Sequence, residues 1–134
     1  MSNITVFTNG CFDILHRGHI ELFKFCKSLG NDVVVGIDTD EKVRLDKGPS
    51  RPYNKLEDRI FTLESIKYID KVYVFNSKED LIQLVKDISP HILVKGSDWR
   101  GKEIVGSQHA QEVKYFERIG NYSTTNILEN SFNR

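Results

Sequence analysis

The feature that most constrains the fold is a regular alternation of short apolar runs with longer amphipathic segments. The runs are rich in β-branched and aromatic residues, which is typical of buried strands. They span residues 4–7, 33–37, 72–75, 92–94 and 113–116. Strands that alternate with helices predict right-handed βαβ crossovers and a parallel sheet. We therefore expect an α/β fold: a Rossmann-like, three-layer α/β/α domain with a parallel sheet.

The segments between the runs carry apolar residues at helical spacing. The expected helices span about residues 20–29, 55–68, 78–88 and 125–130. The charged segment 38–54 holds Gly48 and two prolines, so we expect a short helix and then a mobile loop there. A chain of 134 residues with 39% apolar side chains suffices for one core. Residues 1–134 are therefore expected to form a single domain.

Charge and composition disfavour several classes of partner. The 19 basic and 19 acidic residues give a net charge of +0, which disfavours nucleic acid. There is no apolar run long enough for a membrane span and no apolar leader, so we expect a cytoplasmic protein without membrane contact. Cys11 and Cys26 are expected to be small buried apolar residues. His91 and His109 stand apart, so no protein-held metal site is expected.

The segment after the first expected strand carries the strongest chemical signal. Residues 8–19 run Thr-Asn-Gly-Cys-Phe-Asp-Ile-Leu-His-Arg-Gly-His. Gly10 allows close backbone approach, and the following helix N-terminus favours anions. His16 and His19 could both donate to one phosphate, with Gly18 keeping the space between the imidazoles free. Alternatively, the two histidines only cap the helix or pack against the sheet, and Asp13 is a turn residue or an orienting group.

Other candidate residues also follow expected strands, where ligands of parallel sheets lie. Lys47 and Arg51 lie in the Gly48 loop, although they could be ordinary surface charges. Arg59 could bind a phosphate or be a solvated ion-pair partner on its helix. Asp98 and Trp99 could be a turn residue and a core aromatic, or Trp99 could be a wall of a base pocket. The hydroxyls of residues 123–125 can cap the last expected helix.

Two of these motifs carry a family resemblance. Residues 10–19 resemble the G-x-F-D-x-x-H-x-G-H signature of the cytidylyltransferase-like nucleotidyltransferases, and Ser123-Thr124-Thr125 resembles their second signature. The resemblance implies transfer of a nucleoside monophosphate from an NTP to a phosphorylated small sugar or polyol, with release of pyrophosphate. It also implies a homodimer. Mg²⁺ is expected as the companion of the NTP.

Within the family, the likeness is greatest to adenylyltransferases that act on heptose 1-phosphate, through segments 47–54, 94–99, 103–106 and 123–127. This favours ATP with heptose 1-phosphate, in the synthesis of surface polysaccharide. Arg118 instead resembles the arginine of the cytidylyltransferases that act on glycerol 3-phosphate, so CTP with that acceptor is the alternative. A nucleotide-binding module without turnover is the alternative from another functional class.

The resemblance also assigns roles to residues. It implies that His16 and His19 hold the α- and β-phosphates and that Lys47 closes over the triphosphate. Arg59 and Arg51 are implied at the acceptor phosphate. The implied nucleotide-binding residues are Thr8, Asn9, Gly10, Cys11, Phe12, Gly18, Asp98, Trp99, Arg118, Ser123, Thr124 and Thr125.

Overall fold

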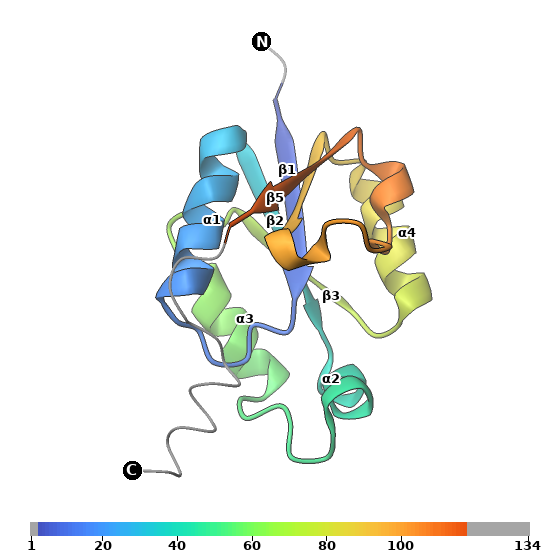
Figure 1. The fold of residues 1–134 in the computed structure, drawn as a ribbon. Coiled ribbons are helices and arrows are strands. Elements are labelled where there is room, and N and C mark those ends of the chain that lie inside the picture. Colours follow the sequence, from blue (N-terminus) through green and yellow to red (C-terminus); the bar gives the residue numbers. More distant parts are fainter. Residues whose placement is uncertain (1–2, 118–134) are drawn as a thin grey trace.

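The fold is built on one parallel sheet, shown in the computed structural model of Figure 1, which describes residues 3–117. The strands are β1 (Thr5–Gly10), β2 (Asp32–Asp38), β3 (Lys71–Phe75), β4 (Ile92–Gly96) and β5 (Glu112–Phe116). The helices are α1 (Arg17–Leu29), α2 (Asp40–Lys47), α3 (Leu56–Glu64) and α4 (Lys78–Ile88). Two short 3₁₀ helices, η1 (Ser97–Trp99) and η2 (Ser107–His109), lie between β4 and β5.

Helices cover the sheet on both faces. Figure 1 shows α1 and α3 on one side of the strands and α4 on the other, with α2 near one end of the sheet. Each face has its own core: Val6, Phe23, Val35 and Leu63 pack on the α1 side, whereas Phe7, Leu81, Val85 and Leu93 pack on the α4 side. This alternation along β1 is the period of two expected of a strand buried on both faces. The predicted three-layer α/β/α fold is confirmed.

The strand order β3-β2-β1-β4-β5 places the first strand in the centre, and every pair is parallel. The chain moves outward from β1 through β2 to β3, and then returns to add β4 and β5 on the other side. The order therefore reverses beside β1. In open α/β sheets, ligands bind at this point, outside the carboxyl ends of the strands. The segments after β1, β2 and β4 are consequently placed for chemistry.

The element boundaries differ from the predicted ones at a few places. Helix α1 begins at Arg17, one turn earlier than the apolar periodicity predicted, because His16 caps it. Helix α3 ends at Glu64 rather than at residue 68, because the Ser65 N–H donates to the carbonyl of Thr62 in a tight turn. The two 3₁₀ helices were not predicted. The helix predicted over residues 125–130 lies outside the described residues.

Two further predictions can be compared with the described residues. Cys26 is fully buried, and burial raises the pKa of its thiol to about 12, as expected of a small core residue. Cys11, predicted to be buried as well, is only partly buried. No helix in residues 3–117 is both long and apolar enough to cross a membrane.

Candidate active site

His16 and His19 stand together at the N-terminus of α1, directly after the β1 loop. The Nδ1 atom of His16 accepts the backbone N–H of Gly18 at 3.0 Å. The Nδ1 atom of His19 accepts the backbone N–H of His16 at 3.2 Å. The two bonds form a reciprocal capping box, which satisfies two backbone donors that the helix itself leaves unpaired. The two histidines therefore do cap the helix, and the capping bonds involve the Nδ1 nitrogen of each ring.

The capping bonds fix which nitrogen of each imidazole donates. A neutral ring whose Nδ1 accepts a hydrogen bond carries its proton on Nε2. The two rings also stack, with centroids 3.9 Å apart and an angle of 28° between their planes. The expectation that Gly18 keeps the space between the imidazoles free is wrong, because the rings contact each other and Gly18 contributes its N–H instead. In this tautomer, each ring of the stacked pair carries its N–H on Nε2.

The Phe12 ring packs against the His19 ring of this pair. Its ring meets that of His19 edge-on at 5.5 Å and that of Phe23 at 5.2 Å. Phe12 is buried and has a φ of 48°, an uncommon backbone conformation for a bulky residue. A Cβ on Gly10 would lie 3.0 Å from the Phe12 ring, so the glycine allows the ring to fold back. Phe12, implied as a nucleotide-binding residue, is therefore packed as a buried support for His19.

Asp13 fastens the β1–α1 loop to the loop before α3. Its buried carboxylate accepts the backbone N–H of Tyr53 at 2.6 Å and that of Asn54 at 2.7 Å. The Asn54 side chain donates in return to the Asp13 carbonyl at 2.8 Å. The Arg51 guanidinium lies 3.5 Å from the same carboxylate. Arg51, implied at the acceptor phosphate, is thus held against Asp13, and the end of the predicted mobile loop is anchored.

Arg59 is buried, with 1% of its surface exposed, in contrast to the solvated arginine that the sequence suggested as one alternative. Its guanidinium donates to the carbonyls of Asn54, Cys11 and Asp38 at 3.1, 3.0 and 2.8 Å. A fourth bond of 2.6 Å reaches the carboxylate of Asp40. A buried charge needs such partners, so these donors are committed to the protein. Arg59 therefore ties the loops after β1 and β2 to α3. The solvated alternative is wrong, and the contact with the acceptor phosphate stays a prediction.

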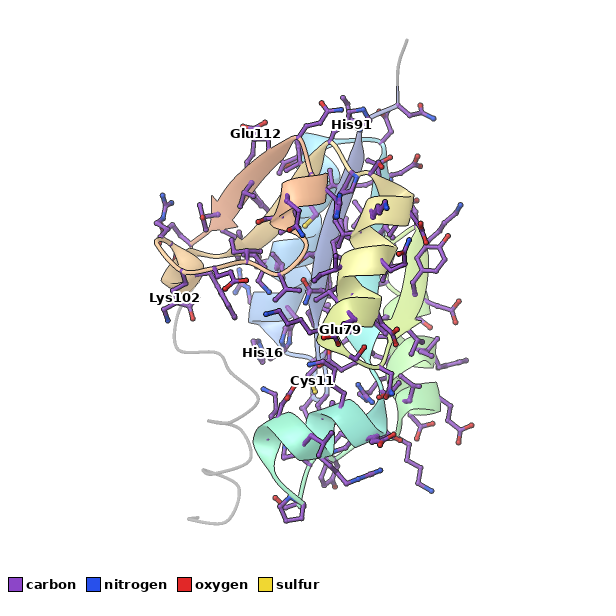
Figure 2. All side chains as sticks on the ribbon, turned by 90° about the vertical axis from the view of Figure 1, so that its right-hand side faces the viewer. Cys11, His16, Glu79, His91, Lys102 and Glu112 are labelled. Carbon is purple, nitrogen blue, oxygen red and sulfur yellow. The ribbon has the colours of Figure 1, made fainter. Side chains whose placement is uncertain are left out.

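The remaining residues that the family resemblance implied lie in different parts of the fold. The Thr8 hydroxyl donates to the Val94 carbonyl at 2.9 Å within the sheet, so it joins β1 to β4. Lys47 is exposed at the C-terminal end of α2. Figure 2 shows Cys11 and His16 in the middle of the view, above the teal helix α2, whereas His91 lies near the top of the view. Arg118, Ser123, Thr124 and Thr125 lie outside the described residues.

Sequence reasoning missed two charged residues at strand ends, Asp38 on β2 and Lys95 on β4. Burial raises the pKa of Asp38, against the lowering effect of Lys42, whose Nζ lies 3.5 Å from its carboxylate. Burial lowers the pKa of Lys95, against the raising effect of nearby carboxylates. Trp99 is 39% exposed, so it is not a core aromatic, and the Lys95 ammonium lies 4.5 Å from the centre of its ring.

Known proteins with similar sequences match most of this chain. The bifunctional protein HldE of Campylobacter fetus is 45% identical over 123 residues, and that of Helicobacter pylori is 44% identical over 124 residues. Each match covers 92% of this chain and 27% of the relative, so the chain spans about a quarter of the length of these relatives.

Solved structures show the same fold. A lipopolysaccharide core biosynthesis protein from Thermoplasma volcanium is 28% identical with a TM-score of 0.71, and the match covers 91% of this chain and all of that protein. Pantothenate synthetase from Thermus thermophilus matches with a TM-score of 0.62 and 15% identity, over 94% of this chain and 61% of that one, which indicates a shared fold only. The model of the cytidylyltransferase-like family matches residues 7–130. This chain therefore belongs to the cytidylyltransferase-like family and is a nucleotidyltransferase.

Proposed function

We propose that the chain transfers AMP from ATP to heptose 1-phosphate, giving ADP-heptose and pyrophosphate. The observation that carries nucleotidyl transfer is the stacked His16 and His19 pair, whose Nε2–H donors stand at a helix N-terminus beside the sheet reversal. The choice of acceptor rests on the sequence likeness in segments 47–54 and 94–99. It is supported by the similarity to a protein described as acting in lipopolysaccharide core biosynthesis.

The reaction needs a positioned nucleophile and stabilised charge rather than a covalent enzyme intermediate. An oxygen of the acceptor phosphate attacks the α-phosphorus of ATP in line, the bond to the bridging oxygen breaks, and pyrophosphate leaves with the electron pair. Negative charge grows on the departing phosphate. Preorganised N–H donors stabilise such charge best when they need no rearrangement. In this proposal, the Nε2–H groups of His16 and His19 supply those donors.

The N-terminus of α1 adds to this stabilisation. Its first turn contains no acidic residue, so the positive end of the helix dipole is not offset locally. Lys47 ends α2 beside Gly48, and in the proposed reaction its ammonium closes over the triphosphate. Residues 123–125 would donate to the β- and γ-phosphates.

Mg²⁺ fits this site as a companion of the nucleotide. Residues 3–117 contain no cluster of three or more His, Cys, Asp or Glu side chains that would form a metal cage. Mg²⁺ commonly binds substrate phosphates with only one or two carboxylates. The ion would therefore be held chiefly by the phosphates of ATP, and it would supply charge neutralisation there.

The second candidate function is CTP with glycerol 3-phosphate, which Arg118 favours because a guanidinium can read a pyrimidine edge or a phosphate with fixed geometry. The test is a pyrophosphate-release assay that crosses ATP, CTP, GTP and UTP with heptose 1-phosphate and glycerol 3-phosphate. We expect the largest kcat/KM for ATP with heptose 1-phosphate. A preference for the CTP pair that is lost in Arg118→Lys would overturn this choice. Light scattering of the same preparation tests the homodimer.

A further inference from the structure

Lys95 and Asp38 lie on one face of the sheet at its reactive end. Side chains alternate along a strand, so residues two apart share a face. Leu93 on β4 and Val34 on β2 both pack in the α4-side core, which places Lys95 and Asp38 on that face, farther toward the carboxyl ends. These two strands flank β1, whose loop carries the histidine pair. The two charges therefore border the point where the strand order reverses.

The Lys95 ammonium has an unusual environment for a lysine. Nζ lies 4.5 Å from the centre of the Trp99 ring, and no oxygen of residues 3–117 lies within hydrogen-bond or ion-pair distance of it. By contrast, Lys42 lies between the carboxylates of Asp38 and Asp46, at 3.5 and 2.6 Å. A partly buried charge without a hydrogen-bond acceptor is costly. The cost is reduced when a ligand supplies that acceptor.

Electrostatics support the same interpretation. Burial lowers the pKa of Lys95, and the carboxylates of Asp38 and Asp98 partly offset that effect by raising it. The ion-pair partner of Asp38 is Lys42, and Lys95 interacts with the Asp38 carboxylate only from beyond contact distance. Since a lysine ammonium has three N–H donors and the Trp99 ring faces only part of it, donors remain for another group.

We propose that Lys95 is a phosphate-binding residue of this active site, with its ammonium donating to phosphate oxygens of a bound substrate. The inference rests on the proposed function, because that function brings a nucleoside triphosphate and a sugar phosphate to this end of the sheet. Trp99 holds the ammonium in place, and partial burial strengthens its attraction to an anion relative to bulk water. The phosphate belongs either to the nucleotide or to the acceptor.

The test compares Lys95→Met and Lys95→Arg with the wild type, and uses Lys102→Met as the matched control. Lys102 is an exposed lysine of the same connection between β4 and β5, and Figure 2 shows it on the surface. Binding of magnesium ATP, pyrophosphate and heptose 1-phosphate is measured separately by calorimetry, together with kcat and both KM values. The melting temperature of each variant is recorded.

We expect Lys95→Met to weaken binding of one ligand class by at least about tenfold, as for the loss of one hydrogen bond to a charged group. Weaker ATP and pyrophosphate binding would identify the nucleotide as the source, and weaker heptose 1-phosphate binding would identify the acceptor. Lys95→Arg should recover part of the affinity, and Lys102→Met should match the wild type.

Two other results would count against the proposals. If Lys95→Met lowers the melting temperature but leaves all affinities and both KM values within about twofold of wild type, Lys95 is a structural partner of Trp99 and the proposal is wrong. If the wild type shows no turnover, the proposed function fails. In that case, loss of pyrophosphate binding in Lys95→Met still supports the inference about Lys95, and unchanged binding refutes it.

Discussion

Asp13→Asn should be among the most damaging conservative substitutions in this protein. The Asp13 carboxylate is buried and accepts two backbone N–H groups, at 2.6 and 2.7 Å, while Arg51 lies 3.5 Å away. An asparagine keeps one acceptor oxygen but turns an NH₂ group toward the backbone donor of Tyr53 or Asn54. It also removes the charge that partners Arg51.

The expected magnitude follows from these losses. Breaking a buried charged pair by changing one partner costs about 3–5 kcal/mol, a large share of the roughly 5–15 kcal/mol that stabilises a domain. For a domain of this size we expect a fall in melting temperature of roughly 10–15 °C. The amides of Tyr53 and Asn54 should also exchange with solvent much faster, because their common acceptor is altered.

Urea and thermal unfolding measure the free-energy change, and amide hydrogen exchange locates it. Asp87→Asn is the matched control, because Asp87 is exposed on α4 and its carboxylate accepts one hydrogen bond within residues 3–117, from Gln83 at 2.8 Å. A loss of less than about 1 kcal/mol in Asp13→Asn, with unchanged exchange at Tyr53 and Asn54, would show that Asp13 does not anchor the loop.

Two further predictions follow from the histidine pair and from a carboxylate far from it. His16→Ala and His19→Ala should each lower kcat by about a hundredfold or more, the usual effect of removing a preorganised donor. His16→Ser should restore helix stability, because serine is a good N-cap, but it should leave kcat low. Melting curves and steady-state kinetics measure these two effects. Recovery of turnover in His16→Ser would refute the role of His16 as a donor. Partial burial raises the pKa of Asp70, but hydrogen bonds from the Val33 N–H and the Lys27 ammonium, at 2.8 and 2.9 Å, outweigh it and leave that pKa lowered. This stabilisation is fully present above the unfolded carboxyl pKa of about 3.9 and is lost as the pH falls through the lower folded pKa. In a plot of unfolding free energy against pH, Asp70→Asn should therefore reduce the slope at acid pH. An unchanged slope would contradict the ion-pair role of Asp70.

The sequence predicted the sheet well because β-branched runs buried on both faces have few other structures open to them. All five predicted strands are present, and α4 spans the predicted residues. The end of α3 was missed because it depends on a local backbone turn at Ser65 rather than on apolar spacing. Such boundaries are set by individual hydrogen bonds that periodicity does not encode.

The site was predicted less completely than the fold. The histidine pair was found from spacing and position, but the stacking of its rings and the edge-on contact of Phe12 with His19 were not. Arg59 was misread although a signal was available: it lies on the same helical stripe as Leu56 and Leu63, which are spaced three and four residues from it. An arginine on an apolar stripe must be buried with partners, and those partners come from distant loops that no local pattern reveals.

The capping box links folding of α1 to the chemistry of the histidines. If the proton of His16 moved to Nδ1, the backbone N–H of Gly18 would lose its acceptor, and the same holds for His19 and the N–H of His16. The folded helix therefore favours the tautomer that donates from Nε2. A phosphate bound at Nε2 favours that same tautomer, so by thermodynamic linkage it must stabilise the start of α1 by as much as the cap favours phosphate binding. The histidines that cap the N-terminus of α1 thus also hold their own Nε2–H groups in the donor tautomer. A substitution at either histidine therefore changes both the stability of the helix start and the binding of phosphate.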